Sequence, residues 1–372
     1  TTLYHLIFVV KIKIIMKVSI LGNGLTSLTL AKALVNLGIY VDIFSSDKTK
    51  KINKIQTLGI SKTNVDFFNT YILDIKKFLW NIDKIEIYSE NLNNEKILNF
   101  ENKKGQLFSI IKNFDLYNLL FLNLKKNKLV KFKKKISYQE LIKSNSNLIF
   151  NCDSHHSISK KFFYKKINKN YDSFAHIANF KHKKILNNNV ASQIFTTKGP
   201  LAFLPISTTE TSVVYSIKGK KVIDLENLIK RYNTKYKIHK VSNFLNFELQ
   251  SSSLRSYYHE NIIAFGDLLH RLHPLAGQGF NMTIRDIKEI HKLIEFKKEH
   301  GLDLDISICS DFEKNSKNKN YLFSNGIDFI HEFFSLENKI NNNLLSKSVK
   351  LLGKNKNVKK FFTKFADNGI VI

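Results

Sequence analysis

The stretch GDLLHRLHPLAGQGFNMTIRD, residues 266–286, concentrates residue types that can bind and orient a ligand. It holds three of the 14 glycines, one of the three prolines and two of the four arginines of a chain dominated by Lys, Asn, Ile, Leu and Phe. Residues 261–267 are expected to form a buried strand that ends at Gly266 and Asp267. An apolar stripe from Phe280 to Ile294 then predicts a helix.

This pattern predicts a site for the polyol and ring end of a cofactor. Gly277, Gln278 and Gly279 are expected at the helix N-terminus, where free N–H groups and the helix dipole attract negative charge. Asp267, at the carboxyl end of a strand, can accept hydrogen bonds from sugar-like hydroxyls.

A second glycine turn lies near the start of the chain. GNGLTS (22–27) separates a predicted strand at 17–21 from a helix at 28–38, and a strand at 39–44 follows. A strand, a glycine turn and a helix within about 30 residues suit a diphosphate, because the glycines let the backbone approach it. An ordinary tight turn is the alternative. Ser27 stands where a third glycine is expected, and Ser45 where an acid would meet the ribose hydroxyls.

Taken together, these stretches resemble the FAD-dependent aromatic hydroxylases, in particular the branch that hydroxylates ubiquinone precursors. Residues 266–286 are similar to the second flavin-binding motif of that family, and NCDSHHS (151–157) to its Asp-Gly motif, with Ser154 in place of the glycine. Further similar segments are 56–68, 174–184, 190–198, 199–207 and 322–335, so the resemblance covers most of 16–369.

The resemblance implies an α/β fold, with a Rossmann-like FAD-binding domain, an interleaved antiparallel-sheet substrate domain and C-terminal helices. The expected FAD-binding domain is discontinuous, spanning 16–70, 101–160 and 255–298. The expected substrate domain spans 71–100 and 161–254, and a C-terminal helical region spans 299–372. Residues 1–15 are expected to be a non-native upstream extension, with Met16 as the start.

The resemblance also implies roles for individual residues. Gly22 and Gly24 would cradle the FAD diphosphate, Asp267 would hold the ribityl chain, and the loop from Pro274 to Gly279 would lie along the flavin ring. The full expected cofactor-binding set is Gly22, Gly24, Ser27, Ser45, Gln56, Asp153, Gly266, Asp267, Pro274, Ala276, Gly277, Gln278, Gly279 and Asn281. Gln56 stands where an arginine is usual, and Leu268–Leu269 replace two alanines.

By the same resemblance, the expected activity is hydroxylation of a polyprenylated phenol, with NADH or NADPH as reductant, O₂ as co-substrate and a flavin C4a-hydroperoxide as oxidant. Pro274 and His273 are the candidate catalytic residues, although the flavin does the chemistry. Leu201, Phe203 and Pro205 are candidates for a wall of the ring pocket, with plain sheet core as the alternative. The alternative functions are a flavin-poor scaffold subunit of a quinone-synthesis complex and an FAD-dependent prenyl reductase.

Other features of the chain bound its partners and its location. The formal charge of +28 comes from 59 basic residues of which only four are Arg, so codon bias explains it better than nucleic-acid binding. Two cysteines make no disulfide framework. A cytoplasmic protein is expected, with possible peripheral contact on the inner membrane face through a basic C-terminal helix bearing Phe361, Phe362 and Phe365, and with other quinone-biosynthesis proteins as possible partners.

The remaining histidines carry weaker expectations. His270 and His273 have i, i+3 spacing, but no third ligand lies nearby in sequence, so no metal site is predicted. His155 and His156 are expected in an exposed turn, and Cys152 as a small core residue.

Overall fold

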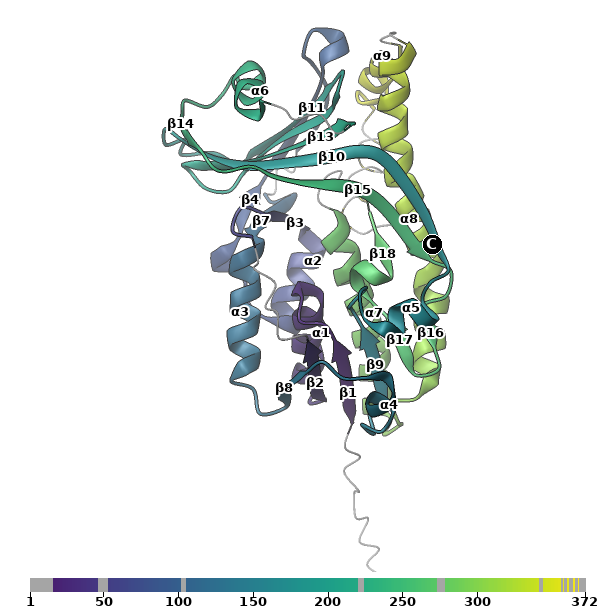
Figure 1. The fold of residues 1–372 in the computed structure, drawn as a ribbon. Helices are drawn as coiled ribbons and strands as arrows, with labels where there is room; N and C mark the ends of the chain where they lie inside the picture. The colour runs from purple at the N-terminus through teal and green to yellow at the C-terminus, as the bar shows by residue number, and fades with distance from the viewer. Residues whose placement is uncertain are drawn as a thin grey trace, which may run out of the picture.

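A computed structural model describes residues 16–45, 53–101, 105–219, 224–272, 278–340 and 344–355, together with positions 357, 360, 364 and 367. The chain is built around three sheets, with a six-stranded, mostly parallel sheet below and a large, mostly antiparallel sheet above (Figure 1). His273, Pro274, Ala276 and Gly277, and the predicted C-terminal aromatics, lie outside the described residues.

The lower sheet has six strands in the order β16-β17-β9-β1-β2-β8. They are β16 (Tyr258–His259), β17 (Ile262–Ala264), β9 (Leu148–Asn151), β1 (Lys17–Leu21), β2 (Tyr40–Ser45) and β8 (Val130–Lys134). All neighbouring pairs are parallel except β16 and β17. The parallel strands therefore end at one edge of the sheet, where the glycine turns follow them.

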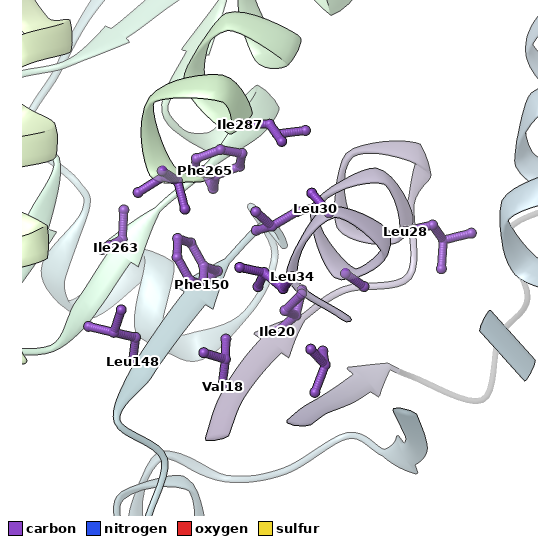
Figure 2. Packing of buried hydrophobic residues seen from close by; sticks show 14 of the residues in the cluster. Val18, Ile20, Leu28, Leu30, Leu34, Leu148, Phe150, Ile263, Phe265 and Ile287 are labelled. Carbon is purple, nitrogen blue, oxygen red and sulfur yellow. The ribbon is translucent and has the colours of Figure 1, made fainter. Parts of the chain in front are cut away.

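Helices cover this sheet and bury its apolar strands. The larger ones are α1 (Leu25–Asn36), α3 (Asn113–Lys125), α7 (Gln278–Glu299) and α8 (Ile306–Ile340), and the short ones are α4 (Tyr138–Ile142) and α5 (Ser157–Phe162). Figure 2 shows the core between them, in which Val18 and Ile20 of β1 and Phe150 of β9 pack against Leu34 of α1 and Phe265. Within the described part of the chain, no helix combines the length and apolar character needed to cross a membrane.

The upper sheet is mostly antiparallel and runs in the order β18-β15-β10-β13-β12-β11-β5-β6, with β14 on β10. Its strands are β18 (His270–Arg271), β15 (Leu245–Leu254), β10 (Lys166–His182), β13 (Glu210–Lys218), β12 (Gly199–Pro205), β11 (Val190–Thr196), β5 (Lys84–Ser89), β6 (Glu95–Glu101) and β14 (Ile238–Val241). Helix α6 (Leu225–Tyr232) covers its outer face (Figure 1).

A small sheet of β3 (Thr57–Ser61), β7 (Phe108–Lys112) and β4 (Trp80–Ile82) lies between the two larger ones. The remaining elements are α2 (Lys62–Phe67), the short turns η1 (Phe68–Ile72), η2 (Lys76–Phe78), η3 (Glu90–Leu92) and η4 (Gly266–Leu268), and α9 (Leu344–Leu352). The small sheet contacts the upper one through Thr57 and Ser212, whose hydroxyl oxygens are 3.3 Å apart, and through the Lys112–Glu210 ion pair at 2.7 Å.

The predicted α/β fold with interleaved domains is confirmed, and several local boundaries differ. Helix α1 starts at Leu25, three residues before the predicted start, because the uncapped Gly24 already accepts the first helical hydrogen bond. The strand expected over 261–267 ends at Ala264, and Asp267 lies in the turn η4. β18, which follows it, pairs with β15 and so ties this segment to the upper sheet.

Candidate cofactor site

The first glycine turn is held open for a ligand. Gly22 has φ +104°, which favours glycine, and its N–H donates to the carbonyl of Phe44 at 2.7 Å. At Gly24 a methyl group would meet no atom within 4 Å. Gly24 is also the N-cap of α1, no side chain caps that helix, and no acid lies in its first turn. The first N–H groups of α1 therefore face open space and suit an anion.

The second glycine motif lies directly against the first. Gly266 has φ +63°, and a methyl group there would come within 2.7 Å of Cγ2 of Thr26, in the first turn of α1. This close approach places Asp267, the next residue, beside the start of α1. Asp267 is exposed, and in the described part of the chain no hydrogen bond or ion pair engages its carboxylate. An unpaired carboxylate there is free to accept hydrogen bonds from a polyol.

The Asp153 loop completes this edge of the sheet. A methyl group on Gly22 would lie 3.3 Å from Oγ of Ser27 and 3.6 Å from Cβ of Asp153. Burial, together with the carboxylates of Asp153 and Asp267, raises the pKa of the Cys152 thiol to about 12. Ser27, Asp153 and Asp267, expected together from sequence, thus lie around one thiol.

The side chains of Ser27 and Asp153 differ in whether the protein already hydrogen-bonds to them. The Ser27 hydroxyl is buried and makes no hydrogen bond of regular geometry, although its proximity favours the Cys152 thiolate. Asp153 is half-buried, and its Oδ1 accepts from the N–H of His155 at 2.9 Å. Ser45 is half-buried at the end of β2, opposite Lys134 of β8, and supplies no carboxylate there.

Asn113, which hydrogen-bonds to Gln56, is a further candidate for the site that the sequence motifs do not indicate. The Gln56 Oε1 accepts from the side-chain amide of Asn113 at 3.1 Å, which leaves Oδ1 of Asn113 buried without a hydrogen-bond partner. A buried acceptor without a partner is costly unless a ligand satisfies it. Asn113 begins α3, far from both motifs in sequence, and no local pattern marks it.

Asn281 was expected to bind the cofactor, and its side chain is engaged within the protein. It is buried: Oδ1 accepts from the N–H of Ser61 and from the side chain of Asn64, both at 2.9 Å, and Nδ2 donates to the carbonyl of Gly59 at 2.9 Å. Asn281 therefore fastens α7 to β3 and α2. Gln278 and Gly279 begin α7, and a methyl group on Gly279 would meet no atom within 4 Å.

The histidines expected near the site have structural roles. His270 is buried and paired with the carboxylate of Asp286, whose other oxygen accepts from Nδ2 of Asn320 at 2.9 Å. This pair joins β18 to α7 and α8. His156 is also buried, contrary to the expected exposed turn, and caps α5 through Nδ1. No group of metal-binding side chains occurs among the described residues.

The predicted ring-pocket wall lies on the face of β12 that helix α6 covers. Leu201 and Phe203 of β12 are buried in a cluster with Leu225 and Ile229 of α6, on the outer face of the upper sheet. Pro205 alternates in phase with them and is also buried. The alternation of β12 is what the sequence predicts, but α6 takes the bulkier face.

The inner face of the same strands is the better candidate for a substrate wall. Leu204 packs against the cluster that includes Ile82 and Ile110 of the small sheet, and Ser212 contacts Thr57, so this face meets the small sheet. Ala202, Leu204 and Val214 on it remain half-exposed, whereas their neighbours on the outer face are buried.

Known structures share this architecture over nearly the whole chain. The p-nitrophenol 4-monooxygenase PnpA of Pseudomonas putida superposes with a TM-score of 0.78 at 12% identity, over 96% of this chain and 99% of that one. HpxO of Klebsiella pneumoniae, solved with FAD and uric acid, gives a TM-score of 0.73 at 11% identity, over 95% and 97% of the two chains. The fold is that of the FAD-dependent aromatic monooxygenases.

In sequence, the chain is related to ubiquinone biosynthesis monooxygenases, which confirms the predicted resemblance. It is 24% identical to mitochondrial COQ6 of Schizosaccharomyces pombe over 277 residues, covering 60% of this chain and 57% of the relative. It is 25% identical to human COQ6 over 235 residues, covering 51% and 50%. The chain thus spans about half the length of the curated relatives it matches. No family model matches it.

Proposed function

We propose that this chain is an FAD-dependent monooxygenase that hydroxylates the ring of a polyprenylated phenol in ubiquinone biosynthesis, using NADH or NADPH and O₂. One observation carries the proposal: the two glycine motifs converge, so that the unpaired carboxylate of Asp267 lies beside the uncapped start of α1. The similarity to COQ6 proteins supports the reaction class.

The residues present fit FAD. The Gly22–Gly24 turn and the start of α1 would hold the diphosphate, since a methyl group at Gly24 would project into open space. Asp267 and the partnerless Oδ1 of Asn113 would accept from the hydroxyls of the polyol. Ser45 supplies no carboxylate for the ribose hydroxyls.

Bound FAD would supply the electron transfer from the nicotinamide to O₂ that side chains cannot perform. The chain would contribute position and dryness. Helix α7 has no acid in its first turn, so its N-terminus would stabilise negative charge on a ring bound beside Gln278 and Gly279. The apolar inner face around Ala202, Leu204 and Val214 would exclude water from the phenol ring.

The lipid nature of the proposed substrate implies a source at a membrane. We therefore extend the proposal to a peripheral position on a membrane surface, where other quinone-biosynthesis proteins would be partners. A chain of net charge +28 suits an anionic surface.

Gly24→Ala tests the cofactor site without disturbing the protein. The φ of Gly24 is −72° and the added methyl group meets no atom of the described residues, so the free energy of unfolding of the flavin-free protein in urea should change by no more than about 1 kcal/mol. A diphosphate at this turn would meet that methyl group. We expect the FAD dissociation constant, measured by flavin fluorescence, to rise at least tenfold. Equal FAD affinity in both proteins would place the cofactor elsewhere.

The reaction is tested with the flavin-loaded protein. NADH or NADPH should reduce the flavin without O₂, and a short-chain prenylated phenol should stimulate oxygen uptake and yield a hydroxylated ring. Tight FAD binding with no hydroxylated product would contradict the proposed reaction and still support the proposed FAD site. A purified protein that binds no FAD would favour the scaffold alternative.

A further inference from the structure

One surface of the molecule exposes several large apolar side chains close together. It is formed by the start of β10, the end of β15 and the middle of α8, which run side by side on one flank of the molecule (Figure 1). Tyr164 is 64% exposed and Ile167 is 49% exposed at the start of β10. Across a depression of about 330 Å³, Tyr321 and Phe329 of α8 are 50% and 65% exposed.

Basic side chains lie on both faces of the start of β10, close to these apolar groups in the chain. Lys165 and Lys166 stand between Tyr164 and Ile167 in the chain, and the backbone of Arg255 bonds to the carbonyl of Lys165 at 3.0 Å. Arg271 of β18 lies close enough that burial and its charge together lower the pKa of Lys166. Among the described residues no carboxylate pairs with any of these four cations.

Two carboxylates on this flank share one cation. Asp328 and Glu332 line the depression from α8, and both pair with Lys169 of β10. The Tyr171 hydroxyl donates to Asp328 as well. With Lys165, Lys166, Arg255 and Arg271, the flank carries more positive than negative charge, and two of the chain's four arginines contribute to it.

We propose that this flank, defined by Tyr164, Lys165, Lys166, Ile167, Tyr321 and Phe329, docks on the surface of an anionic lipid bilayer. Amphipathic aromatic and aliphatic side chains partition into the headgroup region, and unpaired cations meet the lipid phosphates. A nucleic acid would use the cations but leave Ile167 without a role. The surface adjoins the candidate site, because β18 and Asp267 belong to one short segment. Its purpose rests on the proposed function, which needs a lipid substrate.

Vesicle flotation measures this directly on the full chain, without flavin or substrate. The wild type should float with phosphatidylglycerol-containing vesicles and not with pure phosphatidylcholine, and high salt should weaken the binding. The triple variant Lys165→Gln, Lys166→Gln and Ile167→Ser should bind the anionic vesicles roughly 30-fold more weakly, since two surface charges are lost together with an apolar contact.

A matched control lies on a distant loop of the upper sheet. Lys183, Lys184 and Leu186 are exposed and have the same residue types. The variant Lys183→Gln, Lys184→Gln and Leu186→Ser therefore removes the same charge, and it should keep wild-type vesicle binding. An equal loss in both variants would mean that net charge alone drives binding and would overturn the proposal. So would a wild type that binds single-stranded DNA but no vesicle.

FAD affinity, measured on the same three proteins, keeps the two proposals separate. Both triple variants should bind FAD as the wild type does, because none of their residues lies in the candidate cofactor site. Vesicle binding without FAD binding would contradict the proposed enzyme and support the docking surface. FAD binding without vesicle binding would support the enzyme and contradict the docking surface. Circular dichroism checks that each variant is folded.

Discussion

At the scale of single residues, the candidate site depends on two glycines, Gly22 and Gly266. Each is required at its position for a different reason. Gly22 needs its left-handed φ to turn the chain out of β1 toward α1. Gly266 needs both a left-handed φ and the absence of a side chain, because Thr26 occupies the space beside it. The contact at Gly266 is what brings the two motifs together.

Comparing Gly266→Ala with Gly301→Ala separates the cost of backbone strain from the cost of the contact with Thr26. Gly301 has φ +66° and open space around it, so alanine there should cost about 1–2 kcal/mol of unfolding free energy from backbone strain alone. At Gly266 the added methyl group also meets Cγ2 of Thr26 at 2.7 Å, so the cost should be larger by roughly 1–3 kcal/mol. Urea unfolding of the flavin-free proteins measures both. Similar costs in the two variants would mean that the contact with Thr26 relaxes freely.

At the scale of elements, helices α7 and α5 are positioned by side chains whose structural contacts the sequence motifs do not reveal. Asn281 ties α7 to β3 and α2, and His156 starts α5 by accepting from the N–H of Ile158 at 3.3 Å. The other ring nitrogen of His156 faces the carbonyl of Ile136 at 3.1 Å, which fixes a neutral ring that donates from Nε2.

This arrangement predicts an acid-sensitive helix cap. Burial lowers the pKa of His156 from its ordinary value of 6.5, so the unfolded chain binds the proton more readily and stability falls as the pH drops below 6.5. Protonation also removes the Nδ1 acceptor, a loss of about 1 kcal/mol. His156→Asn keeps an acceptor that does not titrate, so its unfolding free energy should fall less than that of the wild type between pH 7 and pH 5.

The neighbouring His155 supplies the control for this experiment. It is exposed, so His155→Asn should follow the wild-type pH dependence. Burial also lowers the pKa of His176 and His291, and part of the acid sensitivity should therefore remain in every variant. A His156→Asn protein with an unchanged pH profile would contradict the capping role.

At the scale of the whole molecule, the position of α6 decides which side of the upper sheet faces the cofactor layer. The outer face of β12 is sealed by α6 around Leu201 and Phe203, and the inner face keeps Ala202 and Leu204 half-exposed. The substrate wall is therefore expected on the side with the smaller side chains, which leaves room for a ring.

Substitutions at adjacent positions of β12 should have opposite effects. Phe203→Ala should lower the unfolding free energy by about 3–5 kcal/mol, because it empties a buried site, and leave the KM for a prenylated phenol unchanged. Ala202→Phe should cost about 1 kcal/mol or less and raise that KM at least tenfold by filling the inner face. A KM that responds to Phe203→Ala and not to Ala202→Phe would return the ring pocket to the outer face.

Much of the site was set by sequence alone, because its features are local. A strand, a glycine turn and a helix need only neighbours in the chain, and left-handed backbone favours glycine, so Gly22, Gly24, Gly266 and Asp267 could be proposed without a structure. The alternation of β12 was equally local.

Only the tertiary structure decided what depends on partners distant in the chain. Alternation gives the period of a strand but not which face a helix will cover, so the sequence did not show that α6 packs on Leu201 and Phe203. Asn281 has the residue type of a ligand-binding group, yet its side chain hydrogen-bonds to Gly59 and Ser61, more than 200 positions away. Asn113 became a candidate only because Gln56 satisfies one end of its amide and nothing in the described protein satisfies the other. Burial and the number of hydrogen bonds that a side chain makes are properties of the packed molecule, because they depend on neighbours in space that the order of residues does not specify.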